Sequence, residues 1–354
     1  MKKPKALVLF YVASVVLLIV GCLGITARIP AAPLAMPDSV LLNAAGATFP
    51  YPIYSKWFTE YNRLHPDIQI NYQSIGSGGG IAQLKAGTVD FGASDMPLTD
   101  QMLSAFKVKV LHFPTVLGAI VPTYNVPGVT QELSFTPDAI AGIYLGKITN
   151  WNDPAIAQAN KGVHLPAQDI VVVHRSDGSG TTFVWTDYLC KISKEWETKV
   201  GKNTSVSWPV GLGGKGNEGV TGLVKQTPGA IGYVELIYAV QNNIPFGRIQ
   251  NAAGAFVKAE LSSVTAAAAG VAKTMPEDFR VSITNSPGKA VYPVCSFTYL
   301  LIPLKIQDAN KAKMIKGFLQ WMLNDGQKDA EGLSYARLPK EIVTKELKQI
   351  SMIQ

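Results

Sequence analysis

Strand-like and helix-like segments alternate along most of this chain, and this alternation constrains its fold more than any other feature. Residues 68–72 alternate apolar and polar side chains, as a half-buried strand does, and residues 170–173 form a short apolar strand. Helical spacing and helix caps predict helices at residues 53–61, 81–86, 136–146, 181–192, 314–322 and 340–350. Strands that alternate with helices favour open α/β sheets, whose ligands bind at loops beyond the carboxyl ends of the strands.

The length of the chain predicts two domains, because 354 residues are too many for one ordinary core. Hydrophobic residues make up 47% of the chain and charged residues 16%, which is typical of a well-buried globular protein. The formal charge of +7 falls to +4 without Lys2, Lys3 and Lys5, which belong to the export signal described next. The other basic residues are scattered and form no stripe interleaved with aromatic residues, so a nucleic-acid partner is not expected.

Residues 1–21 are typical of a signal peptide. Three lysines precede an apolar stretch at residues 6–20, which is short for a membrane span and about right for an export signal. The stretch ends in Ile-Val-Gly-Cys22, which resembles the lipobox of bacterial lipoproteins, where the cysteine is lipidated. Cleavage after Ala35 and an uncleaved anchor are the alternatives. Residues 22–40 are expected to form a flexible tether, and the folded part is expected outside the cytoplasm.

The other two cysteines, Cys190 and Cys295, leave two interpretations open. They could pair in an oxidising compartment, or they could be two buried thiols that behave as small hydrophobic side chains. Neither belongs to a CxxC or CxxH pattern, and the four histidines are scattered along the chain. The sequence therefore predicts no metal site, and no cofactor is expected.

Three glycine-rich turns, at residues 45–50, 76–80 and 175–182, each lie between an extended segment and a predicted helix. A helix N-terminus presents unpaired backbone N–H groups and a partial positive charge, and glycine lets a ligand approach that backbone closely. Three such turns that converge would form an anion site built mainly from neutral dipoles. Singly, each turn is more often a simple helix cap, and none matches the Walker A pattern.

Arg175 distinguishes the third turn from a simple cap, because its guanidinium carries a fixed charge and a fork of donors suited to oxyanions. Asp177, two residues further on, could hold that fork in place or cap the following helix. Asp95 ends an apolar segment at residues 91–94, where a turn or cap residue is also common. These two carboxylates are the acidic candidates for the site.

Together these segments closely resemble the phosphate-binding proteins of the high-affinity phosphate ABC transporters. The resemblance covers about residues 43–300 and rests on the ordered segments GATFP (46–50), YQSIGSGGG (72–80), VDFGASDMPLTD (89–100), FPTV (113–116), IYLGKITNWND (143–153), RSDGSGTTFVW (175–185), GLGGKGNEGV (211–220) and PGAIGYVE (228–235). Beyond residue 300 it rests on helix pattern and length. Gly78, where the family often has serine, and His174, where arginine is common, are departures expected to tune binding rather than abolish it.

The resemblance implies an α/β protein with the two-lobed fold of type II periplasmic solute-binding proteins. Two hinge crossings would join the lobes, and the ligand would lie in the cleft between them. Lobe 1 would comprise residues 41–116 and 294–354, and lobe 2 residues 117–293. The implied function is to bind inorganic phosphate outside the cytoplasmic membrane and deliver it to an ABC permease with a cytoplasmic ATPase, without catalysis. The rims of both lobes would dock on the permease.

The resemblance also implies which residues hold the ligand. The phosphate-binding positions would be Thr48, Phe49, Ser77, Asp95, Arg175, Ser179, Gly180 and Thr181, with Asp177 steadying Arg175. Asp95 would accept the proton that phosphate, unlike sulfate, carries near neutral pH, and it would repel a fully deprotonated anion. Lys215 is given no role, because in this family the segment 211–220 is a structural turn.

Two other functions stay open at the level of sequence. A phosphomonoester hydrolase could use the same turns with Ser77 or Ser179 as the nucleophile, although such chemistry usually needs a metal, a general base or a P-loop lysine. A receptor for another oxyanion, such as molybdate, sulfate or a phosphonate, is closer in class. Asp95 disfavours those that are fully deprotonated.

Overall fold

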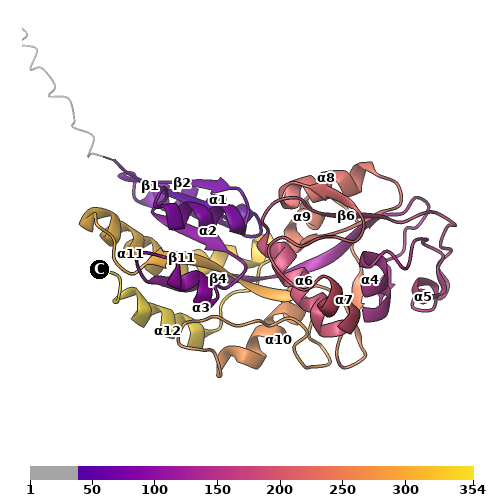
Figure 1. The fold of residues 1–354 in the computed structure, drawn as a ribbon. Helices are drawn as coiled ribbons and strands as arrows, with labels where there is room; N and C mark the ends of the chain where they lie inside the picture. The colour runs from indigo at the N-terminus through magenta and orange to yellow at the C-terminus, as the bar shows by residue number, and fades with distance from the viewer. Residues whose placement is uncertain (1–38) are drawn as a thin grey trace, which may run out of the picture. The chain divides into compact units, whose positions relative to one another are not determined.

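The computed structural model describes residues 39–354. The predicted signal peptide, Cys22 and the alternative cleavage site after Ala35 lie outside the described residues. Within residues 39–354, strands and helices alternate along the chain, as the sequence predicts (Figure 1).

Eight strands form one mixed sheet in the order β2-β1-β3-β11-β4-β8-β6-β7. Their bounds are β1 (Val40–Gly46), β2 (Ile68–Ser74), β3 (Phe91–Ser94), β4 (Val110–Asn125), β6 (Val171–Arg175), β7 (Leu212–Gly214), β8 (Ala230–Glu235) and β11 (Cys295–Pro303). Strand β1 pairs in parallel with β2 and β3, and β6 pairs in parallel with β7 and β8. The antiparallel pairs of β11 and β4 join these two parallel groups. A small second sheet contains β5 (Ser134–Phe135), β9 (Arg248–Gln250) and β10 (Phe256–Val257).

Strand β4 belongs to both halves of the large sheet. Residues 110–119 pair with β11, whereas residues 120–125 pair with β8. The register between β4 and β11 shifts between Thr298 and Tyr299, which indicates a bulge. One long strand therefore carries the chain from the first parallel group to the second.

The helices pack on the same two groups of strands. Helices α1 (Tyr51–Leu64) and α2 (Ser77–Ala86) contact the first group, and α11 (Ala309–Asn324) packs on α1 and on α12 (Lys340–Ile350). Helices α6 (Gly180–Ile192), α8 (Gly216–Gln226) and α9 (Leu236–Gln241) contact the second group. The remaining helices are α3 (Asp100–Ser104), α4 (Pro137–Tyr144), α5 (Pro154–Ala157), α7 (Lys194–Lys199) and α10 (Leu261–Ala272), with 3-10 turns η1 (Gly326–Asp329) and η2 (Glu331–Leu333).

Most of the predicted helices are confirmed. Helix α4 has the predicted Thr136 cap, whose hydroxyl accepts the N–H of Ala139, and Pro137 in its first turn. The predicted start of the helix at residue 81 was wrong, because α2 begins at Ser77 and includes three glycines. Glycine is a poor helix former, but a Cβ at Gly78 would lie 3.0 Å from the Cα of Gly178. The backbone contact between these two segments therefore explains the glycine-rich first turn.

The cysteines of the described region are free thiols, with Cys295 buried and Cys190 half-buried. The structure therefore favours unpaired cysteines, and Cys295 matches the expectation of a buried thiol whereas Cys190 is partly exposed. Across residues 39–354, no helix is both long enough and apolar enough to span a bilayer.

Candidate anion-binding site

Three segments that are far apart in the sequence meet at the N-terminus of α6. The backbone N–H of Asp95, just after β3, donates to the Ser77 hydroxyl at the start of α2 over 3.2 Å. Gly180 begins α6, and a Cβ at this position would lie 2.5 Å from Oδ2 of Asp95 and still closer to the Ser77 hydroxyl. The ends of β3, α2 and α6 are therefore in direct contact.

The turn after β1 joins the same cluster through Asn217 at the start of α8. The side-chain amide of Asn217 donates to the hydroxyl of Thr48 over 2.8 Å and to the hydroxyl of Thr181 over 3.2 Å. All three side chains are buried. The first and third glycine-rich turns are thus linked by one amide group from a fourth segment.

Backbone donors at these turns have no acceptor among the described residues. Helix α1 follows the first turn, and α2 and α6 begin within the other two, so each turn leaves N–H groups outside the helical pattern. Within these turns, the backbone N–H groups of Gly79, Asp177 and Gly178 donate to no described acceptor, and neither do those of Thr48, Phe49, Ser77, Gly180 and Thr181. The last five positions were all predicted from the sequence, and their free donors make the cluster suitable for an anion.

Arg175, at the end of β6, supplies the fixed positive charge and is 3% exposed. Its Nε and Nη2 donate to the two carboxylate oxygens of Asp177 over 2.8 and 2.5 Å. Nη1 is buried and has no partner within residues 39–354. Asp177 also accepts the backbone N–H of Gly216, and its pKa is lowered by Arg175 against the effect of its burial. Asp177 therefore holds the guanidinium, while Ser179 caps α6.

Asp95 is 1% exposed, and its two carboxylate oxygens have different surroundings. The Thr298 hydroxyl on β11 donates to Oδ1 over 2.8 Å, whereas Oδ2 is buried without a hydrogen-bond partner in the described part of the chain. Burial raises the pKa of Asp95 to about 7, although Thr298 and the charge of Arg175 both act to lower it. Oδ2 is therefore an acceptor with no protein donor, which suits a ligand that carries a proton.

The raised pKa of Asp95 predicts that stability depends on pH. The folded carboxyl titrates at about 7 and the unfolded one near 3.8, so the folded state binds more protons between these values. This contribution to stability is complete below about pH 4 and is lost as the pH rises through 7. In anion-free protein, the melting temperature of wild type relative to Asp95→Asn should therefore fall by several degrees between pH 5 and pH 8. Parallel pH profiles for the two proteins would contradict this assignment.

The two serines considered as nucleophiles have backbone groups as their hydrogen-bond partners. The hydroxyl of Ser179 accepts the N–H of Thr182, and that of Ser77 accepts the N–H of Asp95. The carboxylate of Asp95 bonds Thr298 and not a serine. Within residues 39–354, no group of three or more His, Cys, Asp or Glu side chains is arranged to hold a metal ion.

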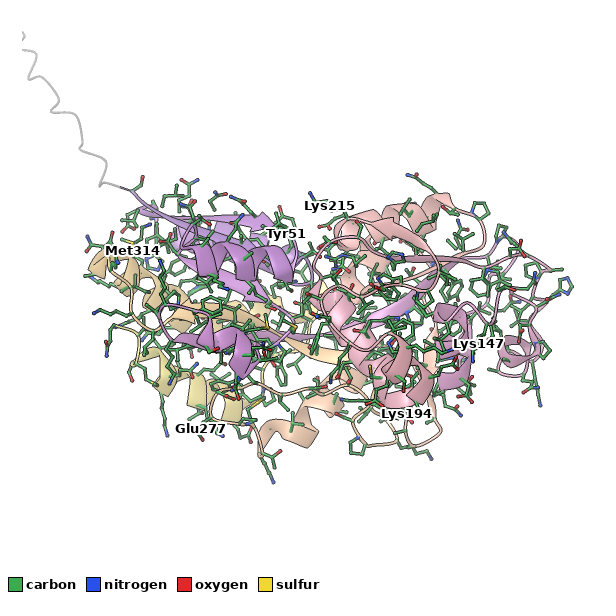
Figure 2. All side chains as sticks on the ribbon, viewed as in Figure 1. Tyr51, Lys147, Lys194, Lys215, Glu277 and Met314 are labelled. Carbon is green, nitrogen blue, oxygen red and sulfur yellow. The ribbon has the colours of Figure 1, made fainter. Side chains whose placement is uncertain are left out.

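Several residues of the cluster were missed by the sequence reasoning. Thr298 and Asn217 contact predicted site residues directly, and Tyr233 accepts the backbone N–H of Arg175. Asn217 lies in the segment 211–220, which was expected to be a structural turn only. Lys215, two residues before it, is exposed at the start of α8 (Figure 2). No local pattern marks Asn217 as a contact, because its partners come from other segments.

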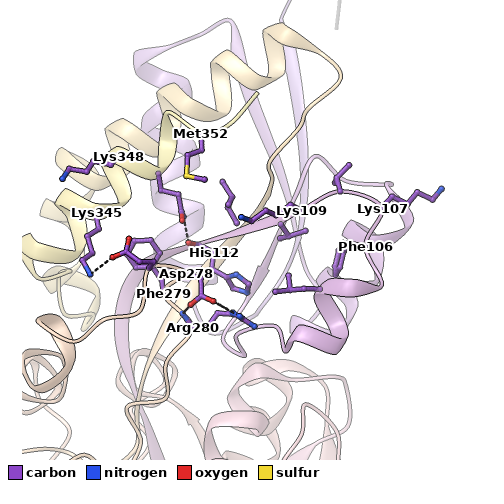
Figure 3. Close-up of a pocket in the computed structure, with 16 residues that line it drawn as sticks. Phe106, Lys107, Lys109, His112, Asp278, Phe279, Arg280, Lys345, Lys348 and Met352 are labelled. Carbon is purple, nitrogen blue, oxygen red and sulfur yellow. Dashed lines mark hydrogen bonds and ion pairs between the residues drawn. The ribbon is translucent and has the colours of Figure 1, made fainter.

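A cavity of about 840 Å³ lies elsewhere, between the start of β4 and α12 (Figure 3). Several polar groups that line it are already paired. His112 accepts the N–H of Leu98, and burial lowers its pKa to about 4, while Arg280 pairs with Asp278 at 2.6 Å. None of the residues that meet at α6 lines this cavity, so its size does not make it the anion site.

Comparisons with known proteins show which family model, relatives and solved structures this chain resembles. Residues 34–326 match the family model described as the PBP superfamily domain. The chain is 47% identical to the phosphate-binding protein PstS of Xylella fastidiosa, over 86% of this chain and 83% of the relative. It is 44% identical to PstS of Pasteurella multocida, over 86% and 88% of the two chains. PstS of Methanocaldococcus jannaschii is 37% identical, over 100% of this chain and 96% of the relative.

Solved structures are similar in fold. A phosphate-binding protein from Stenotrophomonas maltophilia has a TM-score of 0.66 at 18% identity and covers 88% of this chain and 94% of its own. An ABC-type phosphate transport receptor from Vibrio cholerae has a TM-score of 0.53 at 19% identity, with 84% and 100% covered. The predicted α/β fold of periplasmic binding proteins is confirmed.

Proposed function

The chain belongs to the family of PstS phosphate-binding proteins, and on this premise we propose that it binds one inorganic phosphate ion outside the cytoplasmic membrane and delivers it to an ABC permease. The observation that carries the proposal is the cluster at α6. It combines the backbone N–H groups of the predicted positions, five of which donate to no described acceptor, with a carboxylate oxygen of Asp95 that has no hydrogen-bond partner within residues 39–354. Phosphate near neutral pH has oxygens to accept those donors and a P–OH group to donate to Asp95.

We assign the ligand contacts as follows. The free backbone N–H groups and the hydroxyls of the turns bind the phosphate oxygens, Nη1 of Arg175 supplies the one charged donor, and Oδ2 of Asp95 accepts the P–OH proton. The assigned set is Thr48, Phe49, Ser77, Asp95, Arg175, Ser179, Gly180 and Thr181, with Asp177 holding Arg175. The partnerless atoms Nη1 and Oδ2 support this assignment, because buried polar atoms normally have partners.

The number of donors is sufficient for tight binding. Each hydrogen bond to a charged group contributes about 1.5–3 kcal/mol net. On the order of ten such bonds exceed the roughly 8 kcal/mol of a micromolar dissociation constant, even after the costs of ordering and closure. One arginine and many dipoles are therefore enough to hold the anion.

We propose that the ligand lies between two lobes, residues 41–116 with 294–354 and residues 117–293. The change of partner along β4, from β11 up to residue 119 to β8 from residue 120, supports a crossing near the first boundary. Thr48 and Ser77 would then come from lobe 1, and Arg175 and the start of α6 from lobe 2. Closure of the lobes would complete the site and present both rims to the permease.

The family supports the proposed location and partners. PstS proteins act in phosphate import, so an extracytoplasmic location is expected. Attachment through a lipid on Cys22, docking on the permease subunits with their cytoplasmic ATPase, and the absence of catalysis are part of the proposal. A phosphomonoester such as p-nitrophenyl phosphate should not be hydrolysed.

Isothermal titration of ligand-stripped protein tests the function, with phosphate and sulfate run in parallel. Tight one-to-one binding of phosphate and no measurable heat from sulfate are expected. Absence of phosphate binding by a folded sample would overturn the proposed function. Comparable binding of sulfate would leave an anion receptor but remove the role assigned to Asp95.

Gly180→Ala is expected to lower the affinity for phosphate at least tenfold. The added Cβ would lie 2.5 Å from Oδ2 of Asp95 and against the Ser77 hydroxyl, so these groups would be forced apart. Gly222→Ala, in α8, is the matched control, because a Cβ there meets nothing within 4 Å. The control should bind normally and unfold at the same or a higher temperature. Equal affinity of the two variants would show that Gly180 does not lie at the ligand.

A further inference from the structure

Asn217 occupies an unusual position at the start of α8. Its side chain is fully buried, and it contacts the hydroxyls of Thr48 and Thr181, which come from different segments of the chain. The orientation of its amide is set by a third contact. The backbone N–H of Glu235 donates to Oδ1 of Asn217 over 3.0 Å. Since an N–H can only donate, Oδ1 must face Glu235 and the NH₂ group must face the two hydroxyls.

This orientation decides what the two hydroxyls can do. A hydroxyl has one proton to donate and two lone pairs that accept. Thr48 accepts two N–H groups, one from the amide of Asn217 and one from its backbone over 3.3 Å. Thr181 accepts the other proton of the same amide. Neither hydroxyl donates to an acceptor in the described structure, so both protons are free to point at a bound anion.

Two other hydroxyls at the site, those of Ser77 and Ser179, are likewise held as acceptors by backbone N–H groups. Ser77 accepts the N–H of Asp95, and Ser179 accepts the N–H of Thr182. All four hydroxyls are therefore acceptors toward the protein. For the two serines, the donor that fixes the hydroxyl is a backbone N–H group. No side-chain substitution can turn that donor into an acceptor. For Thr48 and Thr181, the shared donor is the side-chain amide of one residue, Asn217.

We propose that Asn217 is a specificity-determining positioning residue, whose amide compels Thr48 and Thr181 to act as donors toward the anion. This inference rests on the proposed function. Ligand oxygens that face these hydroxyls must act as acceptors there, so a P–OH group of the ligand finds the acceptor for its proton at Asp95. Asn217 thus acts on the ligand through the two threonines, without touching it.

Asn217→Asp tests the inference, because it keeps the shape of the side chain and replaces the NH₂ group with an acceptor. Both hydroxyls would turn their protons toward the new carboxylate and present lone pairs to the phosphate. We expect the affinity for phosphate at pH 8 to fall by about a hundredfold or more. Asn217→Ala leaves the hydroxyls free to rotate and should cost less, about three- to tenfold. Asn152→Asp adds the same charge at an exposed position and should bind as wild type does.

The pH dependence separates positioning from a merely structural role. Protonation of the introduced carboxyl restores a donor, so the defect of Asn217→Asp should shrink markedly between pH 8 and pH 5. A structural defect would not recover in this way. Calorimetry of the variants and wild type at both pH values, with melting temperatures as a check on folding, measures the effect.

Two results would overturn the inference while leaving the proposed function intact. One is an affinity of Asn217→Asp at pH 8 that lies within threefold of the wild-type affinity. The other is an equal and pH-independent loss in the Asp and Ala variants. If the Asp variant does not fold, an unchanged affinity in Asn217→Ala would overturn the inference in its place. Failure of wild type itself to bind phosphate would instead remove the proposed function.

Discussion

Asp95→Asn is expected to lower the preference for phosphate over sulfate by on the order of a hundredfold or more. The Thr298 hydroxyl can donate to the amide oxygen as it does to Oδ1 of the carboxylate, which turns the NH₂ group toward the ligand. Phosphate then loses the acceptor for its proton, while sulfate gains a donor and is no longer repelled. Each of these bonds to a charged group is worth about 1.5–3 kcal/mol, and about 1.4 kcal/mol is a factor of ten.

Competitive calorimetry with the two anions measures this ratio directly. Asp100→Asn is the matched control, since this carboxylate is largely exposed and touches none of the site residues. A ratio that stays at the wild-type value in Asp95→Asn would mean that sulfate is excluded by another feature. If the affinities for phosphate and sulfate fell by the same factor, the ratio would also be unchanged and the same conclusion would follow.

Arg175→Met should weaken phosphate binding by about thirty- to several thousand-fold. Removal of one partner of a buried, hydrogen-bonded charge pair costs about 2–5 kcal/mol or more. Here the substitution removes the charged donor assigned to the ligand and also leaves the Asp177 carboxylate without its arginine partner beside an anion. The same change at Arg248, which forms a surface ion pair with Glu132, should leave affinity unchanged.

The double variant Arg175→Met with Asp177→Asn separates these two causes. If part of the loss arises from the uncompensated Asp177 charge, the double variant should bind phosphate more tightly than Arg175→Met alone. Equal affinities would assign the whole loss to the missing guanidinium. Near wild-type binding by Arg175→Met would contradict the assignment of Nη1 as a ligand donor.

Local patterns account for most of the secondary structure. Residues 53–61 carry apolar side chains at helical spacing, and α1 forms around them as Tyr51–Leu64. Thr136 and Pro137 mark the start of α4, because capping depends on neighbours in the sequence. Helix α2 is the exception, since its glycines are favoured by contact with Gly178, about a hundred residues away. The helix propensity of a segment depends on its own residues, so it does not reflect a contact with a distant segment.

The candidate site shows the same difference between what local sequence predicts and what contacts between distant segments determine. The sequence by itself determined which groups are available: three glycine-rich turns before helices, one arginine, and one carboxylate at a strand end. Only the tertiary structure decided how they act together. It left Oδ2 of Asp95 without a partner in the described part of the chain and placed Asn217 between Thr48 and Thr181. Donor and acceptor roles depend on partners in space, and these partners come from segments that nothing in the local sequence connects.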